Sequence, residues 1–292
     1  MRIAIFGVGG QLGRALAAAL VPTHDVVEID HARADVRDAT AVSKALRAAK
    51  PNWVVNCAAM THVDRCENEP ALAFEINAVG ARNVAHASVE TGARLLHVST
   101  DYVFDGEKKE PYVEDDVARP VNAYGVSKLA GEEFVRAESE AHVVVRTSGL
   151  YGWYACRGKG SSFAETILAR AHQGQALRVV SDERLTPTFT EDLAAQIRAI
   201  VERGVPGGIY HATNAGSCSW YEFAQELLRL ARVAATLEPI AASEWKSPTQ
   251  RPANSVLENR ALATLGLDQM PDWRDALARY LAARDDKAGA AS

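Results

Sequence analysis

The stretch from Tyr124 to Lys128 combines two residue types that together can transfer a proton. Within a predicted helix, residues four apart lie on one face, so the phenol and the ammonium are expected to be neighbours. A free phenol has a pKa of about 10, and a nearby cation lowers it towards the range in which proton transfer is efficient. The pattern predicts that Tyr124 donates a proton to a carbonyl oxygen and that Lys128 makes it more acidic. By itself the motif is weak, because amphipathic helices carry the same spacing.

Ser99, Thr100 and Asp101 follow directly after a predicted strand, residues 94–98. Open parallel sheets bind their ligands at the carboxyl ends of the strands, which is where this polar turn is expected. A hydroxyl group at that position could hold the same carbonyl oxygen as Tyr124. The alternative is an ordinary turn that caps the strand.

A glycine-rich turn, residues 7–13, follows the first predicted strand and opens a helix. Glycines let the backbone approach a pyrophosphate, and the free N–H groups of a helix N-terminus attract its charge. The turn predicts a dinucleotide site, although such turns also occur without nucleotides. Asp30 ends the second strand and could bind adenosine ribose hydroxyls or be a solvated carboxylate; Asp35 and Val36 could lie under the adenine. The cofactor residues predicted within the turn are Gly7, Gly10, Gln11, Leu12 and Gly13.

The elements that must hold these groups alternate between strands and helices. The strands are short continuous apolar runs, which indicates burial on both faces, and the intervening helices indicate parallel connections. The sequence predicts an α/β fold, a Rossmann-type doubly wound parallel sheet with a smaller C-terminal α/β substrate subdomain. We expect strands at residues 2–6, 26–29, 53–57, 94–98 and 142–146, and helices at residues 11–20, 39–49, 71–90 and 124–139.

The pattern is less regular after Thr147. We predict a dinucleotide-binding domain over residues 1–148 and a smaller subdomain mainly over residues 149–284, with some segments returning to the first domain. The last helix is expected at residues 273–283, and residues 285–292 are expected to form a flexible polar tail.

Composition excludes several classes of protein. The 292 residues include 32 Lys and Arg against 37 Asp and Glu, a net charge of −5, which disfavours nucleic acid or an anionic membrane as partner. No run approaches the roughly 20 apolar residues of a membrane span. The glycines near the N-terminus leave no room for a secretory signal, so we expect a cytoplasmic protein. The four cysteines form no CxxC pair and are expected to be reduced thiols.

Seven stretches in a fixed order carry a resemblance to a known family, and each is weak alone. They are residues 54–61 (VVNCAAMT), 63–64 (VD), 99–104 (STDYVF), 124–132 (YGVSKLAGE), 146–148 (RTS), 187–188 (PT) and 251–255 (RPANS). Together they resemble the dTDP-4-dehydrorhamnose reductases, which belong to the extended short-chain dehydrogenases/reductases. The resemblance covers about residues 1–281, nearly the whole chain.

The resemblance implies a function and a set of site residues. The implied reaction is reduction of the 4-keto group of dTDP-4-dehydro-beta-L-rhamnose to dTDP-beta-L-rhamnose with NADPH, or with NADH. Tyr124 is the implied proton donor, Lys128 holds the nicotinamide ribose, and Thr100 lies beside Tyr124. The smaller subdomain would bind the sugar nucleotide. The remaining implied cofactor contacts are Ala59, Met60 and Thr61, and the substrate residues are Thr100, Asp101, Asn77, Trp153 and Arg251.

The sequence departs from the family pattern at two points. Gly149 stands where reductases of this family carry an aromatic residue that packs on the substrate, so Trp153 or Tyr154 is expected to replace that ring, or the sugar pocket has changed. Ala15 stands where some relatives carry an acidic residue that helps to hold a metal ion at a dimer contact. We therefore expect no metal, and a homodimer stays open.

Three alternatives remain at this stage. Gly149 favours another nucleotide-sugar 4-ketoreductase or an epimerase. A non-catalytic nucleotide-binding subunit is a third class, because the regulatory subunit of methionine adenosyltransferase resembles the same reductases. Asp30 would repel a 2′-phosphate and favour NADH, whereas Arg33 and Arg37 would offset it. Two pyrophosphates must bind to a negative protein, for which the candidate cations are Lys159, Arg178 and Arg251.

Overall fold

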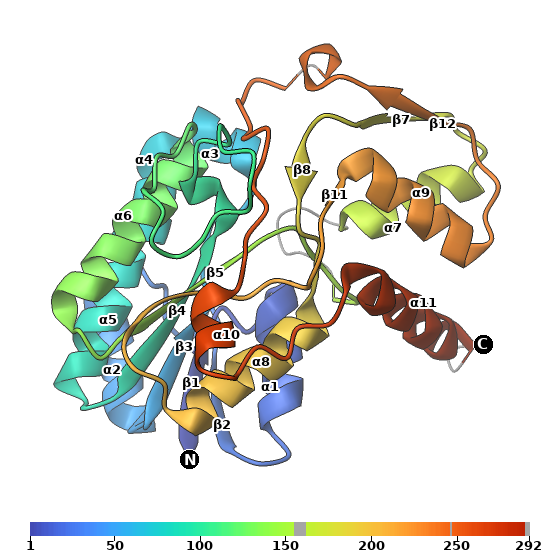
Figure 1. Ribbon diagram of the computed structural model, residues 1–292. Coiled ribbons are helices and arrows are strands. Elements are labelled where there is room, and N and C mark those ends of the chain that lie inside the picture. Colours follow the sequence, from blue (N-terminus) through green and yellow to red (C-terminus); the bar gives the residue numbers. More distant parts are fainter. Residues whose placement is uncertain (155–161, 246, 290–292) are drawn as a thin grey trace.

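A six-stranded parallel sheet forms the centre of the molecule, in the order β10-β5-β4-β3-β1-β2 (Figure 1). The computed structural model describes residues 1–154, 162–245 and 247–289. Every strand pair in this sheet is parallel. The predicted α/β fold is therefore confirmed. The strands are β1 (Arg2–Phe6), β2 (Asp25–Ile29), β3 (Trp53–Asn56), β4 (Arg94–Thr100), β5 (Val143–Thr147) and β10 (Gly208–His211).

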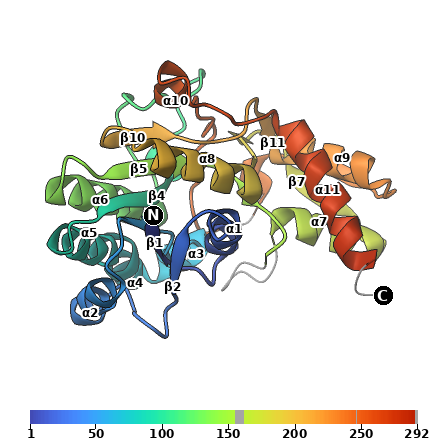
Figure 2. The same cartoon turned by 90° about the horizontal axis from the view of Figure 1, so that it is seen from below.

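Helices cover both faces of the sheet (Figure 2). Apolar side chains of α1 (Gln11–Leu20) and α8 (Thr190–Arg203) pack on one face. The other face packs against α2 (Ala39–Ala49), α5 (Gly80–Glu90) and α6 (Ala123–Glu138). β3 and β5 are buried along their whole length, which explains the apolar runs at residues 53–55 and 143–145.

The connection from β3 to β4 differs from the single helix expected at residues 71–90. It contains α3 (Val63–Asn68), α4 (Pro70–Phe74), a π-helical turn (Glu75–Val79) and then α5. A π-helical turn inside a helix is rare and is frequent at functional sites. This one contains Asn77, which is fully buried.

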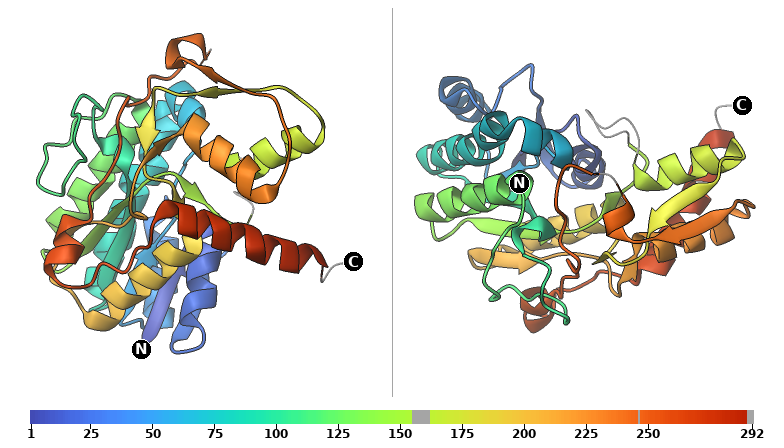
Figure 3. Two further views of the ribbon diagram at one scale, coloured as in Figure 1. Left: turned by 45° about the vertical axis from the view of Figure 1, so that its right-hand side comes forward. Right: turned by 90° about the horizontal axis from the view of Figure 1, so that it is seen from above.

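The remaining elements form a smaller unit with its own core beside the sheet (Figure 3). Its helices are α7 (Phe163–His172), α9 (Trp220–Ala231) and α11 (Trp273–Gly289). The last helix is longer than the expected residues 273–283, because α11 continues to Gly289, and the flexibility of residues 285–292 stays a prediction. Short strand pairs complete the unit: β6 (Leu150–Tyr151) with β9 (Thr188–Phe189), β7 (Leu177–Val180) with β12 (Leu237–Ile240), and β8 (Arg184–Leu185) with β11 (Cys218–Ser219).

Two later segments return to the larger unit. α8 packs on α1, and β10 pairs with β5 at the edge of the sheet, where α10 (Arg260–Thr264) lies against it. We propose that residues 1–148 with these segments form the dinucleotide-binding domain and that the rest of residues 149–284 forms the substrate subdomain. Short 3-10 helices occur at Asp101–Val103 and Ala242–Glu244. Among the described residues, no helix is both long and apolar enough to span a membrane.

A buried ion pair fixes α6 against the sheet. Arg146 on β5 donates from Nη2 to Glu132 Oε2 at 2.7 Å and from Nε to Glu132 Oε1 at 3.0 Å. Both side chains are at most 3 % exposed. Ser99 Oγ on β4 also donates to Glu132 Oε1. The carboxylate of Glu132 thus joins α6 to the central strands β4 and β5. On β4 its partner, Ser99, directly precedes Thr100.

Breaking this pair should destabilise the fold. Glu132→Gln leaves the Arg146 guanidinium buried without a counter-charge, so we expect the free energy of unfolding to fall by about 3 to 5 kcal/mol. Glu244→Gln is the control, because it breaks the exposed Arg178–Glu244 pair and should cost less than about 1 kcal/mol. Urea denaturation measures both variants. Equal losses would contradict the structural role of Glu132.

Candidate active site

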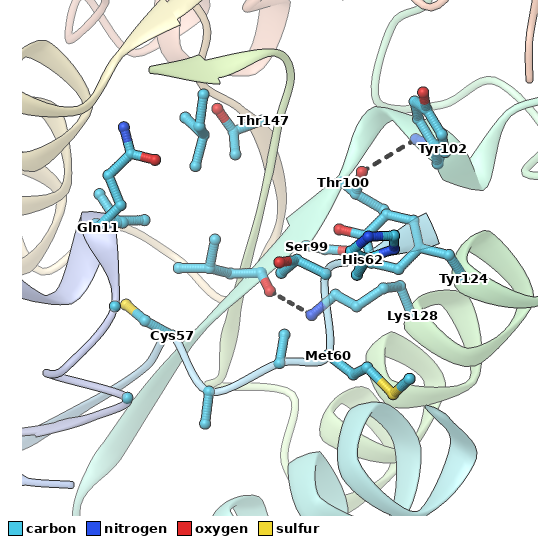
Figure 4. Close-up of a pocket in the computed structure, with 18 of the residues that line it drawn as sticks. Gln11, Cys57, Met60, His62, Ser99, Thr100, Tyr102, Tyr124, Lys128 and Thr147 are labelled. Carbon is cyan, nitrogen blue, oxygen red and sulfur yellow. Dashed lines mark hydrogen bonds between the residues drawn. The ribbon is translucent and has the colours of Figure 1, made fainter. Parts of the chain in front are cut away.

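A cavity of about 720 Å³ lies at the carboxyl ends of the parallel strands, where a doubly wound sheet binds ligands (Figure 4). Phe6, Cys57, Thr100 and Thr147 line it from the ends of β1, β3, β4 and β5. Every residue predicted to contact the cofactor or to take part in catalysis lines this cavity. Of the predicted substrate residues, Thr100 and Asp101 line it, whereas Asn77, Trp153 and Arg251 are absent from its wall.

The glycine-rich turn is built for close approach of the backbone. Gly7 has φ +74°, and a Cβ added to it would lie 2.6 Å from the nitrogen of Ala58. A Cβ on Gly13 would lie 2.4 Å from the Gly7 carbonyl oxygen. Gly10 is the N-cap of α1 and supplies no side chain, so the first N–H groups of α1 lack a side-chain cap. A pyrophosphate fits this turn because those N–H groups attract its charge.

The part of the cavity that is predicted to bind adenosine carries charges of both signs. Asp30 Oδ1 accepts a hydrogen bond from the Arg33 backbone at 2.9 Å. The Arg37 guanidinium donates to Asp35 at 2.6 Å and lowers the pKa of that carboxyl. Asp30, His31, Asp35 and Arg37 line the cavity, whereas Arg33 donates to the Glu28 carbonyl and stands outside its wall.

The predicted proton donor lies beside the polar turn after β4. Burial raises the pKa of the Tyr124 phenol, and a hydrogen bond with Thr100 acts in the opposite direction. Thr100 Oγ1 also lies 3.0 Å from Asp101 Oδ1 and donates to it. Ser148 Oγ donates to Asp101 Oδ2 at 2.7 Å, and burial raises the pKa of this carboxyl. The site therefore presents a phenol and a hydroxyl side by side, with a buried carboxyl behind them.

Lys128 does not contact the phenol in the way that the sequence suggested. Its Nζ donates to the Val98 carbonyl at 2.7 Å and lies 3.2 Å from His97 Nε2. The causes that shift the pKa of Tyr124 are burial, Thr100, Asp101 and Cys66, in that order. Burial itself lowers the pKa of Lys128 to about 8. The expected lowering of the phenol pKa by Lys128 is thus missing here, because the amine is turned towards β4.

Asn77 supports the cavity wall from behind. Its side chain accepts a hydrogen bond from Met60 N at 2.8 Å and donates to Met60 O at 3.0 Å and to Ser127 Oγ at 3.0 Å. The π-helical turn brings this fully buried amide under the loop of residues 58–61. Its place is therefore that of a residue that fixes Met60 beside α6, and it does not face the cavity as the predicted sugar contact would.

Two other predicted substrate residues are also occupied elsewhere. The Trp153 ring packs edge-to-face on Phe189, and its Nε1 donates to the Tyr280 carbonyl at 3.1 Å. Arg251 donates to Asp64 Oδ1 at 3.0 Å, although Pro252 next to it lines the cavity. Gly149 does line the cavity, and the smaller core holds Trp153 away from it.

The cavity wall includes residues that the sequence reasoning missed. Phe163 and Trp220 form an aromatic pair, with ring centroids 4.6 Å apart, in the part of the wall that also contains Glu183 and Arg184. Trp220 is the first residue of α9, directly after the N-cap Ser219. The Ser219 and Glu222 pair of the capping box marks this helix start in the sequence. Arg178 pairs with Glu244 at the surface. Lys159 and Cys156 lie outside the described residues.

The described cysteines, Cys57, Cys66 and Cys218, are free thiols. Burial raises the pKa of Cys57 to about 12, which keeps it protonated. In the described ranges, no cluster of three or more His, Cys, Asp and Glu side chains could hold a metal ion, and the expected absence of a metal stays a prediction.

Comparison with known proteins identifies the family. The family model described as the RmlD substrate binding domain matches residues 1–285. A dTDP-4-dehydrorhamnose reductase from Mycolicibacterium smegmatis is 39% identical over 97% of this chain and 85% of its own length. The chain belongs to the dTDP-4-dehydrorhamnose reductase family. A family member from Bacillus anthracis, whose crystal structure is a complex with NADP, has a TM-score of 0.92 and 37% identity, covering 96% of this chain and 98% of its own.

A second relative of similar sequence identity is named for a different activity. It is a probable dTDP-4,6-dihydroxy-2-methyloxan-3-one 4-ketoreductase from Streptomyces antibioticus. It is 40% identical over 95% of this chain and 93% of its own length. Membership of the reductase family therefore does not by itself identify the sugar substrate.

An added side chain at Gly149 should be costly. Gly149 has φ +54°, and a Cβ would lie 2.6 Å from Leu185 Cδ1. We expect Gly149→Ala to lower the free energy of unfolding by about 2 to 3 kcal/mol, from backbone strain and the clash together. Gly174→Ala isolates the strain, because Gly174 has φ +69° and open space around it, and should cost about 1 kcal/mol. Thermal and urea unfolding of both variants give the comparison; equal costs would show that the Leu185 contact is unimportant.

Proposed function

We propose that this chain reduces the 4-keto group of dTDP-4-dehydro-beta-L-rhamnose to give dTDP-beta-L-rhamnose, with NADPH as the reductant. Membership of the family makes the chain an NAD(P)H-dependent oxidoreductase. The observation that carries the proposal is the continuous cavity that joins the glycine turn to Tyr124 and Thr100. One wall binds a dinucleotide, and the phenol and hydroxyl lie further along the same space.

Each group at this site has a distinct task in the proposed reaction. When bound, the nicotinamide cofactor supplies the hydride for the carbon of the keto group. Tyr124 gives its Oη proton to the keto oxygen as that oxygen gains charge, and Thr100 donates a hydrogen bond to the same oxygen. Thr100 now donates to Asp101, so its hydroxyl must rotate away from that carboxyl towards the substrate. Ser148 keeps the Asp101 carboxyl in place.

The adenosine end supports NADPH and leaves NADH as an alternative. The structurally similar Bacillus anthracis reductase is a complex with NADP. Here Arg37 and His31 line the cavity near Asp30, so a 2′-phosphate would meet the Arg37 guanidinium, whose charge offsets the Asp30 carboxylate. An Arg side chain is a strong partner for phosphate. With NADH, Asp30 itself would bind the ribose hydroxyls.

The far end of the cavity suits a pyrimidine nucleotide. The Phe163 and Trp220 rings give a stacking surface for the base. Arg184 also lines the cavity, and its guanidinium, which now contacts Glu222 and Ser217, would have to turn from them to pair with a phosphate. The aromatic ring missing at Gly149 is thus replaced, in this proposal, by a ring from the smaller unit. Cytoplasmic location and a homodimer stay predictions.

A related sugar 4-ketoreductase is the second candidate. The Streptomyces antibioticus relative is named for a different sugar ketone, and glycine at position 149 leaves out the aromatic ring expected to pack on the sugar. Both observations favour a sugar other than dTDP-4-dehydro-beta-L-rhamnose. Turnover of dTDP-4-dehydro-beta-L-rhamnose, followed as NADPH consumption, separates the two. Binding of this sugar without oxidation of NADPH would favour the second candidate.

Removing the phenol oxygen should abolish proton donation with little other change. We expect Tyr124→Phe to lower kcat by roughly 100-fold or more and to leave the NADPH Kd nearly unchanged. Tyr210→Phe is the matched control, because the Tyr210 hydroxyl donates to the Pro206 carbonyl and lies outside the cavity wall. Steady-state kinetics and fluorescence titration provide both readouts. Unchanged activity in Tyr124→Phe would favour the non-catalytic alternative.

The Phe163 and Trp220 pair should contribute to binding of the sugar nucleotide and should not affect binding of NADPH. We expect Trp220→Ala to raise the KM for the dTDP-sugar by about tenfold, since base stacking contributes about 1 to 3 kcal/mol. The KM for NADPH should stay the same. Trp245→Ala is the control, because Trp245 is exposed and does not line the cavity. An equal rise in both KM values would place Trp220 outside the nucleotide subsite.

A further inference from the structure

A leucine side chain fills the space beside Gly149 in the cavity wall. Gly149 has φ +54°, and a Cβ added to it would lie 2.6 Å from Leu185 Cδ1 and 3.2 Å from the Thr186 carbonyl oxygen. Any side chain at position 149 would therefore have to displace Leu185. Both residues line the cavity, so Leu185 forms the part of the wall that a side chain at position 149 would otherwise form.

Two neighbouring segments hold the backbone of Leu185 in this place. On β8, Leu185 pairs with Cys218 of the antiparallel strand β11. The residue before it is bound to a second segment, because Arg184 N donates to the Ala253 carbonyl at 2.8 Å and Ser255 N donates to the Arg184 carbonyl at 2.8 Å. These bonds keep Leu185 beside Gly149.

The side chain of Leu185 is buried, but it is not part of a core. It is 4 % exposed. The other leucines of the cavity wall, Leu12, Leu72 and Leu150, each pack on an apolar core. Leu185 belongs to none of the apolar clusters formed by the described residues. Its apolar surface is therefore available to a ligand in the cavity.

Short contacts connect this part of the wall to the groups that would hold the reacting carbonyl. Ser148, directly before Gly149, donates to Asp101 Oδ2 at 2.7 Å. Thr100 donates to Asp101 Oδ1 at 3.0 Å and is the proposed donor to the keto oxygen. Leu185 therefore lies on the side of the cavity that would meet the sugar close to its keto carbon.

Both candidate substrates have an apolar group at this point of the ring. In dTDP-4-dehydro-beta-L-rhamnose, C5 has a methyl group and adjoins the keto carbon C4. The Streptomyces antibioticus relative is named for a 2-methyloxan-3-one, in which the carbon with the methyl group again adjoins the keto carbon. The remaining substituents of the rhamnose ring are bonded through oxygen. An apolar wall beside the keto carbon thus favours the methyl group over any other substituent.

We propose that Leu185 determines specificity for 6-deoxy sugars by packing against this methyl group. The inference rests on the proposed reduction of a sugar ketone and is the same for both candidate sugars. The backbone carbonyls nearby already accept hydrogen bonds: Thr188 N donates to the Gly149 carbonyl at 3.2 Å, and Thr188 Oγ1 donates to the Thr186 carbonyl at 3.2 Å. A hydroxyl group in place of a methyl hydrogen would have to compete with these bonds or lie unpaired against Leu185, which weakens binding.

Two sugar nucleotides that differ only at C6 test this contact without turnover. dTDP-beta-L-rhamnose has a methyl group there and dTDP-beta-L-mannose has a hydroxymethyl group, and neither has a ketone that NADPH could reduce. Calorimetric titration of the full-length protein in the presence of NADPH gives both Kd values. We expect the wild-type protein to bind dTDP-beta-L-rhamnose about tenfold more tightly. Equal binding of the two sugar nucleotides would overturn the inference.

Variants of Leu185 should change this preference in opposite directions from one matched control. We expect Leu185→Ala to raise the Kd of dTDP-beta-L-rhamnose about tenfold, to bring the two Kd values together, and to leave the Kd of dTDP unchanged. Leu185→Asn keeps the size of the side chain but offers hydrogen bonds, so it should bind dTDP-beta-L-mannose more tightly. Leu228→Ala is the control, because it removes a buried leucine of the smaller core that does not line the cavity, and it should keep the wild-type ratio. An unchanged ratio in Leu185→Ala, or an equal loss of affinity for dTDP, would contradict the role of Leu185.

The wild-type complex decides the question even if a variant fails to fold. A crystal structure with dTDP-beta-L-rhamnose and NADPH should place the methyl carbon within about 4.5 Å of the Leu185 side chain. A methyl group elsewhere in the cavity would overturn the inference. Turnover of dTDP-4-dehydro-beta-L-rhamnose is measured separately. Turnover without a preference for the methyl group would contradict only the role of Leu185, whereas the preference without turnover would support that role and contradict the proposed function.

Discussion

The contact of α6 with β4 is the constraint on which the site depends. Glu132, Lys128 and Tyr124 occupy successive turns of one helix face, and each has a partner on β4: Ser99, His97 with the Val98 carbonyl, and Thr100. The buried pair of Glu132 and Arg146 fixes the helix at one end of this row. Buried ion pairs are costly to form and costly to break, so they fix one arrangement rather than contribute much net stability. Here the arrangement that is fixed is the distance between the phenol and the end of the sheet.

Local donors offset the negative net charge where the two anionic ligands of the proposed reaction would bind. The net charge of −5 is an average over the chain, whereas the cavity offers local donors. In the proposed function, the N-terminus of α1, which has no side-chain cap, would bind one phosphate group, and Arg37 and Arg184 also line the cavity. Lys128 also lines the cavity, and burial lowers the pKa of its amine to about 8. Local geometry thus decides binding, and the overall charge has little influence on it.

Much of the fold could be predicted because its signals are local. The uninterrupted apolar strands and the glycine turn indicated the parallel sheet and the start of α1, and the structure confirms both. The order of motifs indicated the family, which the comparisons confirm. The contacts that the sequence did not predict join distant segments. Trp153 is drawn into a core with Phe189, and Lys128 turns to His97, thirty-one positions away, which spacing within one helix cannot reveal.

The central claim is that hydride reaches the sugar carbon that carries the keto group. The direct test is to incubate the enzyme with dTDP-4-dehydro-beta-L-rhamnose and NADPH that carries deuterium at both positions of nicotinamide C4. Proton and deuterium NMR of the purified product then locate the label. We expect one deuterium on C4 of the reduced sugar and none elsewhere. Oxidation of NADPH with no deuterium on the sugar, or unreacted sugar in the presence of folded enzyme that binds both ligands, would contradict the central claim.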